Sequence, residues 1–284
     1  MASLRDLRRR IKSVKNTQKI TKAMELVAAS KMRRAQERVE ASRPYADEIT
    51  NVIADLFKRA PEYKHPYLEV REASKRLVLL VTSDRGLVGA LNSNNIRLAL
   101  REMNESPSPA SVVTIGRKGR EAMRRLRKDL VADRSNLGDR PSMGDVLPAI
   151  RVAMEQYENG DVHQVDVVFS HFISPGRQQA LVRRLLPVEV PEGTEHLAAN
   201  FIYEPEPQDV LDALLPRYVE SQIYQAVLEN LASQMAAQML AMHNASDNAS
   251  DLIKDYTLAA NTVRQSSITT ELMDIVGGAA ALAG

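Results

Sequence analysis

The chain has 284 residues, of which 38 are Lys or Arg and 36 are Asp or Glu, and only 4% are aromatic. It contains no Cys, which excludes disulfides, thiol catalysis and thiolate metal sites. No apolar run approaches the roughly 20 residues that cross a bilayer, and the N-terminus lacks the apolar core of a signal peptide. We therefore expect a folded cytosolic protein, and the low aromatic content with 11 Met favours long packed helices.

Charge is unevenly distributed along the chain. Residues 1–43 contain thirteen Lys and Arg against four Asp and Glu, a balance of +9, whereas residues 205–284 contain three against ten, a balance of −7. Opposite charges at the two ends favour pairing of the ends with each other. A basic N-terminal segment is also typical of proteins that bind nucleic acid or an anionic membrane. No aromatic residue interleaves the basic residues before Tyr45, which favours a protein–protein role.

Residues 3 to about 58 predict one long coiled-coil helix, because apolar or small residues recur at spacings of three and four. Ser3 and Asp6 resemble a capping box at its start. Pro44 is expected to bend or break the helix. The predicted stripe consists of Leu4, Leu7, Ile11, Val14, Thr17, Ile20, Met24, Val27, Met32, Ala35, Val39, Ser42, Ala46, Ile49, Ile53 and Leu56.

The middle of the chain alternates between strand-like and helix-like segments. Apolar, β-branched runs predict strands at 76–84, 110–116, 165–174 and 179–188. Helical patterns follow the first two strands, and another helix is expected over 143–157. This alternation predicts a largely parallel sheet with helices on its faces. Residues 187–207 indicate a linker with one short strand, "FIY".

From Gln208 to Leu282 the helical pattern returns, with a seam that runs from Ile223 to Val263. Seventy-odd helical residues extend roughly 110 Å, against roughly 80 Å for the N-terminal helix. We therefore expect a mixed α+β fold, in which the two termini form a long antiparallel coiled coil and a Rossmann-like α/β domain is inserted between them. The predicted domains are 1–60 (N-terminal helix), 75–200 (α/β domain) and 205–284 (C-terminal helix).

The motif "SDRGLVGALN" (83–92) places two glycines between a strand and a helix, where backbone N–H groups can hold phosphate. It lacks the spacing of a dinucleotide or P-loop fingerprint, so a structural turn tied together by Asp84 and Arg85 is the favoured interpretation. The five histidines are scattered, and no Ser/His/Asp arrangement is evident. The sequence thus indicates no active site, metal or cofactor. The alternative functions are a nucleotide- or small-molecule-binding α/β enzyme with a coiled-coil arm, and a nucleic-acid binder.

The C-terminal end of the second helix is apolar on every side. Leu272, Met273, Ile275, Val276 and Ala279 to Ala281 together point in every direction around the helix, and such a helix must be enclosed. The shorter N-terminal helix cannot enclose it, so another protein is expected to do so. Alternatively, a bend at Gly277 and Gly278 would fold the tip onto the α/β domain. Just before the tip lies a polar group consisting of Arg264, Gln265, Thr269 and Glu271.

Four segments together resemble the γ subunit of F-type ATP synthases. They are "LRRRIKSVKNTQKITKAMELVAASKMRRAQ", "SDRGLVGALN", "LLPRYVESQIYQAVLENLASQMAAQMLAMHNASDNASDLI" and "RQSSITTELMDIVGGAAAL". The family pattern Ile-Thr-x-Glu-x-x-Asp/Glu-x-x-x-Gly-Ala is met by Ile268, Thr269, Glu271, Asp274, Gly278 and Ala279. The chain departs from many members at Val88 and Ala90 in the turn and at Ala260 in the upper helix.

The resemblance implies a non-catalytic rotor shaft, present in one copy per complex. It would transmit torque between a membrane ring of c subunits and a hexamer of α and β subunits, beside an ε subunit, so that proton flow drives ATP synthesis. It further implies a peripheral location on the cytoplasmic face of a bacterial plasma membrane, no cofactor and no nucleic-acid partner. The implied sites are Lys22, Met24, Arg264, Gln265, Thr269 and Glu271 for β-subunit contact, Leu272, Met273, Ile275, Val276 and Leu282 in the hexamer sleeve, and Tyr203 and Glu204 at the c-ring and ε foot.

Overall fold

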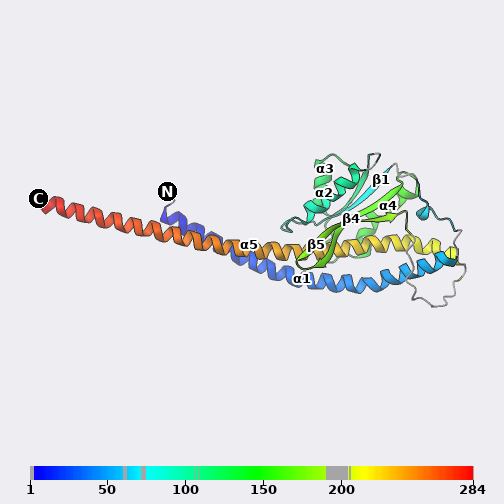
Figure 1. Cartoon of the computed structure of the whole chain (residues 1–284), viewed down its shortest axis with the longest axis horizontal. Coiled ribbons are helices and arrows are strands. Elements are labelled where there is room, and N and C mark those ends of the chain that lie inside the picture. Colours follow the sequence, from blue (N-terminus) through cyan, green and yellow to red (C-terminus); the bar gives the residue numbers. More distant parts are fainter. Residues whose placement is uncertain are drawn as a thin grey trace. The chain divides into compact units, whose positions relative to one another are not determined.

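A computed structural model describes residues 3–59, 63–71, 75–105, 107, 109–189, 204 and 206–283. The chain divides into two compact units: an end unit of Met1–Val27 with Met239–Gly284, and a central unit of Ala28–Gln238. Helices α1 (Leu4–Arg59) and α5 (Pro207–Ala283) each run through both units (Figure 1). The domain boundaries drawn from the sequence remain a prediction.

The central unit contains a five-stranded sheet with the strand order β3-β2-β1-β4-β5. Its strands are β1 (Arg76–Val81), β2 (Ser111–Ile115), β3 (Asp129–Arg134), β4 (Gln164–Ser174) and β5 (Arg177–Leu186). All neighbours are parallel except β4 and β5, so the predicted, largely parallel sheet is confirmed. The edge strand β3 was not predicted, because "DLVADR" is partly exposed and lacks a buried apolar run.

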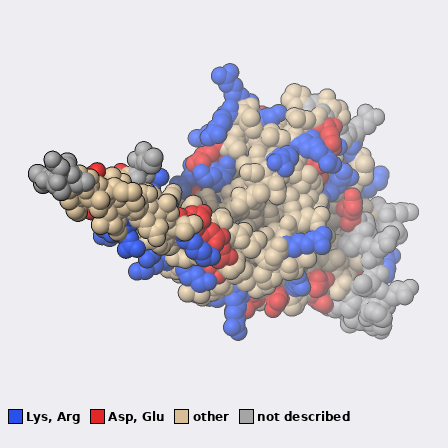
Figure 2. Space-filling model, turned by 60° about the vertical axis from the view of Figure 1, so that its left-hand side comes forward, with Lys and Arg blue, Asp and Glu red and all other residues tan. Residues whose placement is uncertain are grey.

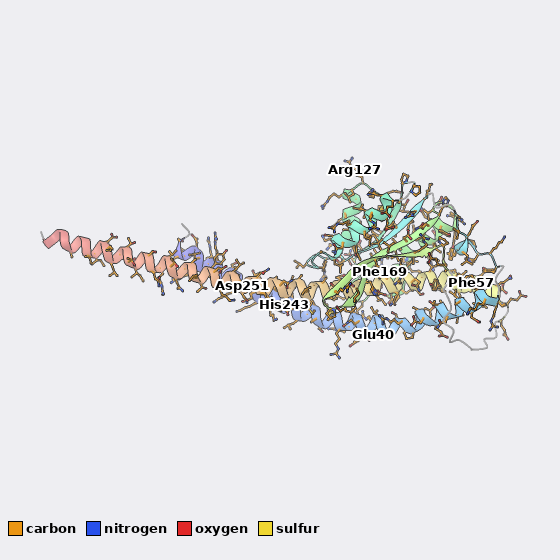
Figure 3. The ribbon with its side chains drawn as sticks, viewed as in Figure 1. Glu40, Phe57, Arg127, Phe169, His243 and Asp251 are labelled. Atoms are coloured by element: carbon orange, nitrogen blue, oxygen red, sulfur yellow. The ribbon has the colours of Figure 1, made fainter. Side chains whose placement is uncertain are left out.

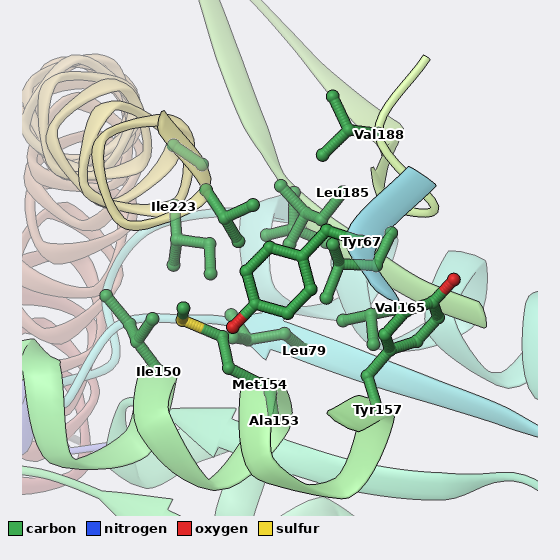
Figure 4. Close-up of a cluster of buried hydrophobic side chains, with 14 of the residues drawn as sticks. Tyr67, Leu79, Ile150, Ala153, Met154, Tyr157, Val165, Leu185, Val188 and Ile223 are labelled. Atoms are coloured by element: carbon green, nitrogen blue, oxygen red, sulfur yellow. The ribbon is translucent and has the colours of Figure 1, made fainter. Parts of the chain in front are cut away.

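Helices cover both faces of the sheet, as the alternating pattern predicts. Helices α2 (Leu91–Asn104) and α3 (Arg117–Arg125) share a buried cluster with Val78 and Leu80 of β1. Helix α4 (Met143–Glu158), the short 3₁₀ helix η1 (Pro66–Leu68) and α5 share a second cluster with Leu77 and Leu79. Figure 4 shows side chains of η1, α4, the sheet and α5 meeting in that second cluster. Because residues alternate between the faces of a strand, β1 joins the two layers.

In the central unit, α1 and α5 pack against each other as antiparallel helices. Ala35 and Val39 of α1 share a buried cluster with Leu228 and Met235 of α5, and the Ser42 hydroxyl bonds to Gln225 at 2.5 Å. The predicted antiparallel pairing is therefore confirmed here. The break expected at Pro44 does not occur, because α1 continues to Arg59 with the proline on its exposed side.

Between Thr17 and Val27 the seam of α1 differs in phase from the predicted one, whereas at Leu7, Ile11 and Val14 it agrees. Ile20 and Val27 are 60% and 55% exposed, whereas Thr21 and Ala28 are buried. The true seam keeps a regular heptad spacing through Gln18, Thr21, Glu25 and Ala28 to Met32. The prediction at Thr17, Ile20 and Val27 is wrong because these positions are exposed, and it followed hydrophobicity whereas this part of the seam is polar or small.

The polar part of the seam is held by hydrogen bonds between the helices. Gln18 donates to Ser250 at 2.6 Å, and the Thr21 and Ser246 hydroxyls are 2.7 Å apart. Glu25 contacts His243 at 3.3 Å, in the part of α5 where Figure 3 labels His243 and Asp251. The descending numbers on one helix against ascending numbers on the other show that the pair is antiparallel in this unit too.

The expected pairing of the basic N-terminal segment with the acidic C-terminal one is not realised. Among the described residues of the end unit, no Lys or Arg of α1 forms an ion pair with an Asp or Glu of α5. Arg10 instead lies over the Tyr256 ring, 6.0 Å from its centroid. The reason is that this part of the seam is occupied by polar neutral residues and Glu25, whereas Lys12, Lys15, Lys19 and Lys22 are exposed.

Candidate functional site

The motif at residues 83–92 forms the turn after β1, and its Asp84 carboxylate is fully engaged within the protein. It accepts hydrogen bonds from the backbone N–H groups of Arg117 (2.9 Å), Asn136 (3.0 Å) and Leu137 (3.1 Å). Converging backbone N–H groups of this kind form an anion-binding nest. Here the anion is a side chain of the chain itself, so Asp84 takes the position that a phosphate would need.

The backbone that faces this turn, just after β2, requires a glycine. Gly116, just after β2, has a φ of 105°, and a Cβ placed on it would lie 2.1 Å from the Thr82 carbonyl oxygen. Its N–H donates to the Arg134 carbonyl at 2.7 Å. The ends of β1, β2 and β3 are therefore drawn together too closely for any side chain at residue 116, which indicates a structural role.

The crevice between β1 and β4 is where open α/β sheets usually bind ligands, because the chain changes faces there. In this protein α5 occupies it. The Asn230 side-chain oxygen accepts hydrogen bonds from the Asn95 amide at 3.0 Å and from the Ser170 backbone N–H at 3.1 Å. Together with Asp84, this packing favours the structural interpretation of the motif over nucleotide binding.

The described histidines are bonded locally. The Tyr67 backbone N–H donates to His65 at 3.0 Å, His171 pairs with Glu229, and His243 contacts Glu25. Burial lowers the pKa of His65. In the part of the chain that the structure describes, no group of three or more His, Cys, Asp or Glu is placed to hold a metal ion. The same part contains no helix that is long and apolar enough to span a membrane.

The C-terminal part of α5, from Arg264 to Ala279, packs against no other helix among the described residues of the end unit. Burial along α5 ends at Ala260, and the residues from Arg264 to Ala279 are all exposed. In Figure 1 the red end of α5 extends beyond the N-terminal end of α1. This long exposed segment contains the polar group and the apolar tip identified in the sequence.

The polar group forms two rows on the helix surface. Arg264 and Glu271 are seven residues apart and lie almost on one line, while Gln265 and Thr269 lie about 100° and about 140° around the axis from Arg264. The Thr269 hydroxyl donates to the Gln265 carbonyl at 3.0 Å, and the structure shows no partner among the described residues for the Arg264 or Glu271 side chains. The structure thus leaves two charged groups available to a protein partner.

The apolar tip is exposed on all sides of the helix. Leu272, Met273, Ile275 and Val276 are between 56% and 69% exposed. The helix continues through Gly277 and Gly278, so the alternative bend at this glycine pair does not occur. Leu282 lies within α5, but its side chain is outside the described residues.

The remaining predicted contact residues lie in two other places. Lys22 is exposed and its ammonium contacts Glu25 at 3.0 Å, which, with help from His243, lowers the pKa of Glu25. Met24 is half-buried. Glu204 is exposed, whereas Tyr203 and the predicted "FIY" strand lie outside the described residues. Within the end unit, Lys22 and Met24 lie on α1, whereas the polar group and the apolar tip lie on α5.

Sequence reasoning missed the polar contacts that join α5 to its neighbours. They include Gln18, Thr21 and Ser246 in the seam, and Asn95 with Asn230 at the sheet. The only available signal was the presence of polar residues at seam spacing within long helical segments. That signal names no partner, because the partner residues are more than 100 positions away in the sequence.

Comparison with known proteins identifies the family. The family model described as "ATP synthase" matches residues 3–282. The ATP synthase γ chain of Dehalococcoides mccartyi is 48% identical over the full length of both chains, and that of Acidithiobacillus ferrooxidans is 47% identical over 99% of this chain and all of the relative. The chain belongs to the ATP synthase γ-chain family. The γ-chain fold accordingly accounts for both long helices and the inserted sheet.

Solved structures agree with this assignment. A central-stalk chain of the Tetrahymena thermophila mitochondrial ATP synthase is 27% identical, with a TM-score of 0.64, over 80% of this chain and 99% of that chain. A rotor chain of the Euglena gracilis enzyme has a TM-score of 0.67 at 18% identity, over 93% of this chain and 98% of that chain, and supports the fold alone. The predicted fold class and family are thus confirmed. As a γ chain, the protein is a non-catalytic rotor-shaft subunit of a membrane-bound ATP synthase complex.

Proposed function

We propose that this γ chain passes torque between a membrane ring of c subunits and a catalytic hexamer of α and β subunits, with an ε subunit beside its foot. The observation that carries the proposal is the exposed apolar tip at the end of α5. Burying four large apolar side chains in a partner is favourable by roughly 25 cal/mol for each Å² removed from water. A matching sleeve in the hexamer would supply that burial.

Smooth apolar contact also suits a rotating shaft. Apolar burial is non-directional, so a tip such as that of Leu272 and Ile275 is not held at one angle by hydrogen bonds. The charged Arg264 and Glu271, lower on the helix, are placed to form and break bonds with successive β subunits. Gln265 and Thr269 add a neighbouring polar row for the same partners.

Lys22 and Met24 are proposed as the lower β-subunit contact, and Tyr203 and Glu204 as the foot that faces the c ring and ε. The chain would act on the cytoplasmic face of a bacterial plasma membrane, attached only through the complex and present in one copy. The chain's own side chains perform no covalent step in this scheme, since ATP is made and hydrolysed on the β subunits.

Co-expression with the α and β subunits of the same source tests the proposal. A tagged chain is expected to co-purify with both subunits, and the complex is expected to hydrolyse ATP and to rotate in a single-molecule assay. The combined variant Arg264→Ala with Glu271→Ala should assemble but lower ATP hydrolysis severalfold, because the β-subunit contacts are lost.

A matched control replaces an exposed pair of opposite charges elsewhere, Arg101→Ala on α2 with Glu105→Ala just after it, and should leave hydrolysis unchanged. Failure of the wild-type chain to bind the α and β subunits would refute the proposed role. Equal hydrolysis by both double variants would refute the assignment of Arg264 and Glu271.

A further inference from the structure

One buried polar cluster joins α5 to the α/β sheet. This Asn230 cluster consists of Asn95 on α2, Ser170 on β4, and Asn230 and Ser233 on α5, and none of them is more than 2% exposed. Asn230 accepts from the Asn95 amide and the Ser170 N–H. The Ser170 hydroxyl donates to Asn95 at 2.8 Å, and the Ser233 hydroxyl donates to the Ser170 carbonyl at 2.9 Å.

The cluster holds four elements at once. The Asn95 amide also donates to the Val81 carbonyl at the end of β1, at 3.0 Å, so α5 is bonded to α2, β4 and, through Asn95, to β1. Both amide hydrogens of Asn95 are therefore used, and its oxygen is used by Ser170. Hydrogen bonds of this kind at a buried site specify one arrangement, because breaking them leaves polar groups without partners.

The other polar contacts of α5 with the sheet around this point each include a partly exposed side chain, since Glu229 pairs with His171 and Arg183 donates to Gln222. The remaining contacts are apolar. Ile223 and Val227 pack in the apolar cluster beneath the sheet. Such burial is non-directional, so by itself it does not select one precise angle of the helix about its own axis. Hydrogen bonds require a narrow range of distance and angle, so rotation or sliding of α5 by one residue would break those made by Asn230.

We infer that the Asn230 cluster fixes the angle of α5 relative to the α/β sheet and thereby carries torque between them. The inference rests on the proposed function, in which load applied to the sheet must turn the helix and not slip around it. Asn230 is a positioning residue in this scheme, since it acts through the helix and contacts no nucleotide.

The test measures torsional stiffness in the assembled complex of this chain with α and β subunits. Because the chain contains no Cys, a single Arg125→Cys change on the exposed end of α3 gives a unique attachment point for a bead. With the hexamer fixed and the motor paused, the angular variance of the bead reports the stiffness between sheet and shaft. Asn230→Leu keeps the side-chain volume and is expected to raise that variance about twofold, because two hydrogen bonds are lost.

Three comparisons separate torque transmission from stability. Asn230→Asp keeps the accepting oxygen, so it should retain wild-type variance even though a buried charge lowers the melting temperature. Thr114→Val, at a buried hydroxyl with no hydrogen-bond partner among the described residues, should leave the variance unchanged and raise the melting temperature, because an unsatisfied polar group is removed. A bead attached through Arg43→Cys on α1, which packs directly on α5, should show no change with Asn230→Leu.

The outcomes distinguish this inference from the proposed function. If the wild-type complex does not assemble and rotate, the proposed function fails. If it rotates and Asn230→Leu leaves the variance unchanged, only the Asn230 inference fails. Should Asn230→Leu not assemble, Ser233→Ala removes one bond of the same cluster, and an unchanged variance in that variant overturns the inference.

Discussion

Asp84 shows how a single side chain can satisfy converging backbone N–H groups at the end of a sheet. Its carboxylate bonds to backbone N–H groups of two segments, after β2 and after β3, and so closes the edge of the sheet. The turn motif that suggested phosphate binding is thereby a structural joint. Its close packing depends on Gly116, which leaves no space for a side chain.

Gly116→Ala should destabilise the protein by about 3 kcal/mol or more, because the new methyl group meets the Thr82 carbonyl and the positive φ is strained. Urea denaturation of the full chain measures the change. Gly86→Ala is the matched control, since no atom lies within 4 Å of its Cβ position and its φ is not positive. A similar loss in both variants would contradict the argument.

Asp166 on β4 is a buried carboxylate whose stability contribution depends on pH. It is 2% exposed, accepts from the Gln164 amide at 2.6 Å and lies 3.8 Å from Arg184. Burial raises the pKa of Asp166, and the Gln164 bond and Arg184 oppose that rise without cancelling it. A folded-state pKa above the unfolded value means that stability is fully present below the unfolded pKa. It is lost as the pH rises through the folded pKa.

Asp166→Asn should therefore raise the free energy of unfolding at pH 7 by about 1 kcal/mol, because a buried charge is removed. The gain should shrink as the pH falls to about 4, near the ordinary pKa of Asp, where the wild-type side chain becomes neutral too. Urea denaturation at the two pH values provides the measurement. A variant that is less stable than wild type at pH 7 would show that the Arg184 pair outweighs desolvation.

At the scale of elements, the two long helices are held together by a seam whose chemistry changes along its length. In the central unit the α1 side of the seam includes Ala35 and Val39, whereas in the end unit it includes Gln18, Thr21 and Glu25. Polar seam residues specify register at a cost in stability. The heptad spacing is continuous through both parts. Hydrophobicity alone misplaced the seam by one residue because the seam positions from Gln18 to Glu25 are polar.

Pro44→Ala should stabilise the chain by about 3 kcal/mol, because proline inside a helix lacks the N–H donor and clashes with the preceding turn. Thermal or urea unfolding of the full chain measures this gain. Arg43→Ala, next to it on the exposed surface, serves as the control and should change stability by less than about 0.5 kcal/mol. If Pro44→Ala brings no gain, the helix must already relieve the clash by local distortion.

At the scale of the whole molecule, the apolar tip links the structure to its complex. Within the proposed role, Ile275→Lys places a charge in an apolar sleeve and should slow rotation under load about twofold, because a buried, unpaired charge is costly. Single-molecule rotation of the assembled complex measures speed and torque. Leu126→Lys makes the same change at an exposed position after α3 and should leave rotation unaffected. Unchanged torque and speed with Ile275→Lys would count against an enclosing sleeve.

The sequence by itself determined the elements and the family. Periodicity reports which faces are buried, so the long helices, four of the five strands and the largely parallel sheet could be predicted. Family-specific segments at both ends identified the γ chain. The exposed edge strand β3 gave no such signal, because little of it is buried.

Only the tertiary structure decided which polar groups meet. The Asp84 bonds join residues 33 and 52 positions apart, and the bond between Asn95 and Asn230 joins residues 135 positions apart. The phase of the seam near Thr21 likewise depends on Ser246 of the other helix. Burial follows a local period that one segment reveals alone. A hydrogen bond requires a partner at a defined distance and angle, and that partner is brought close only when the chain is folded.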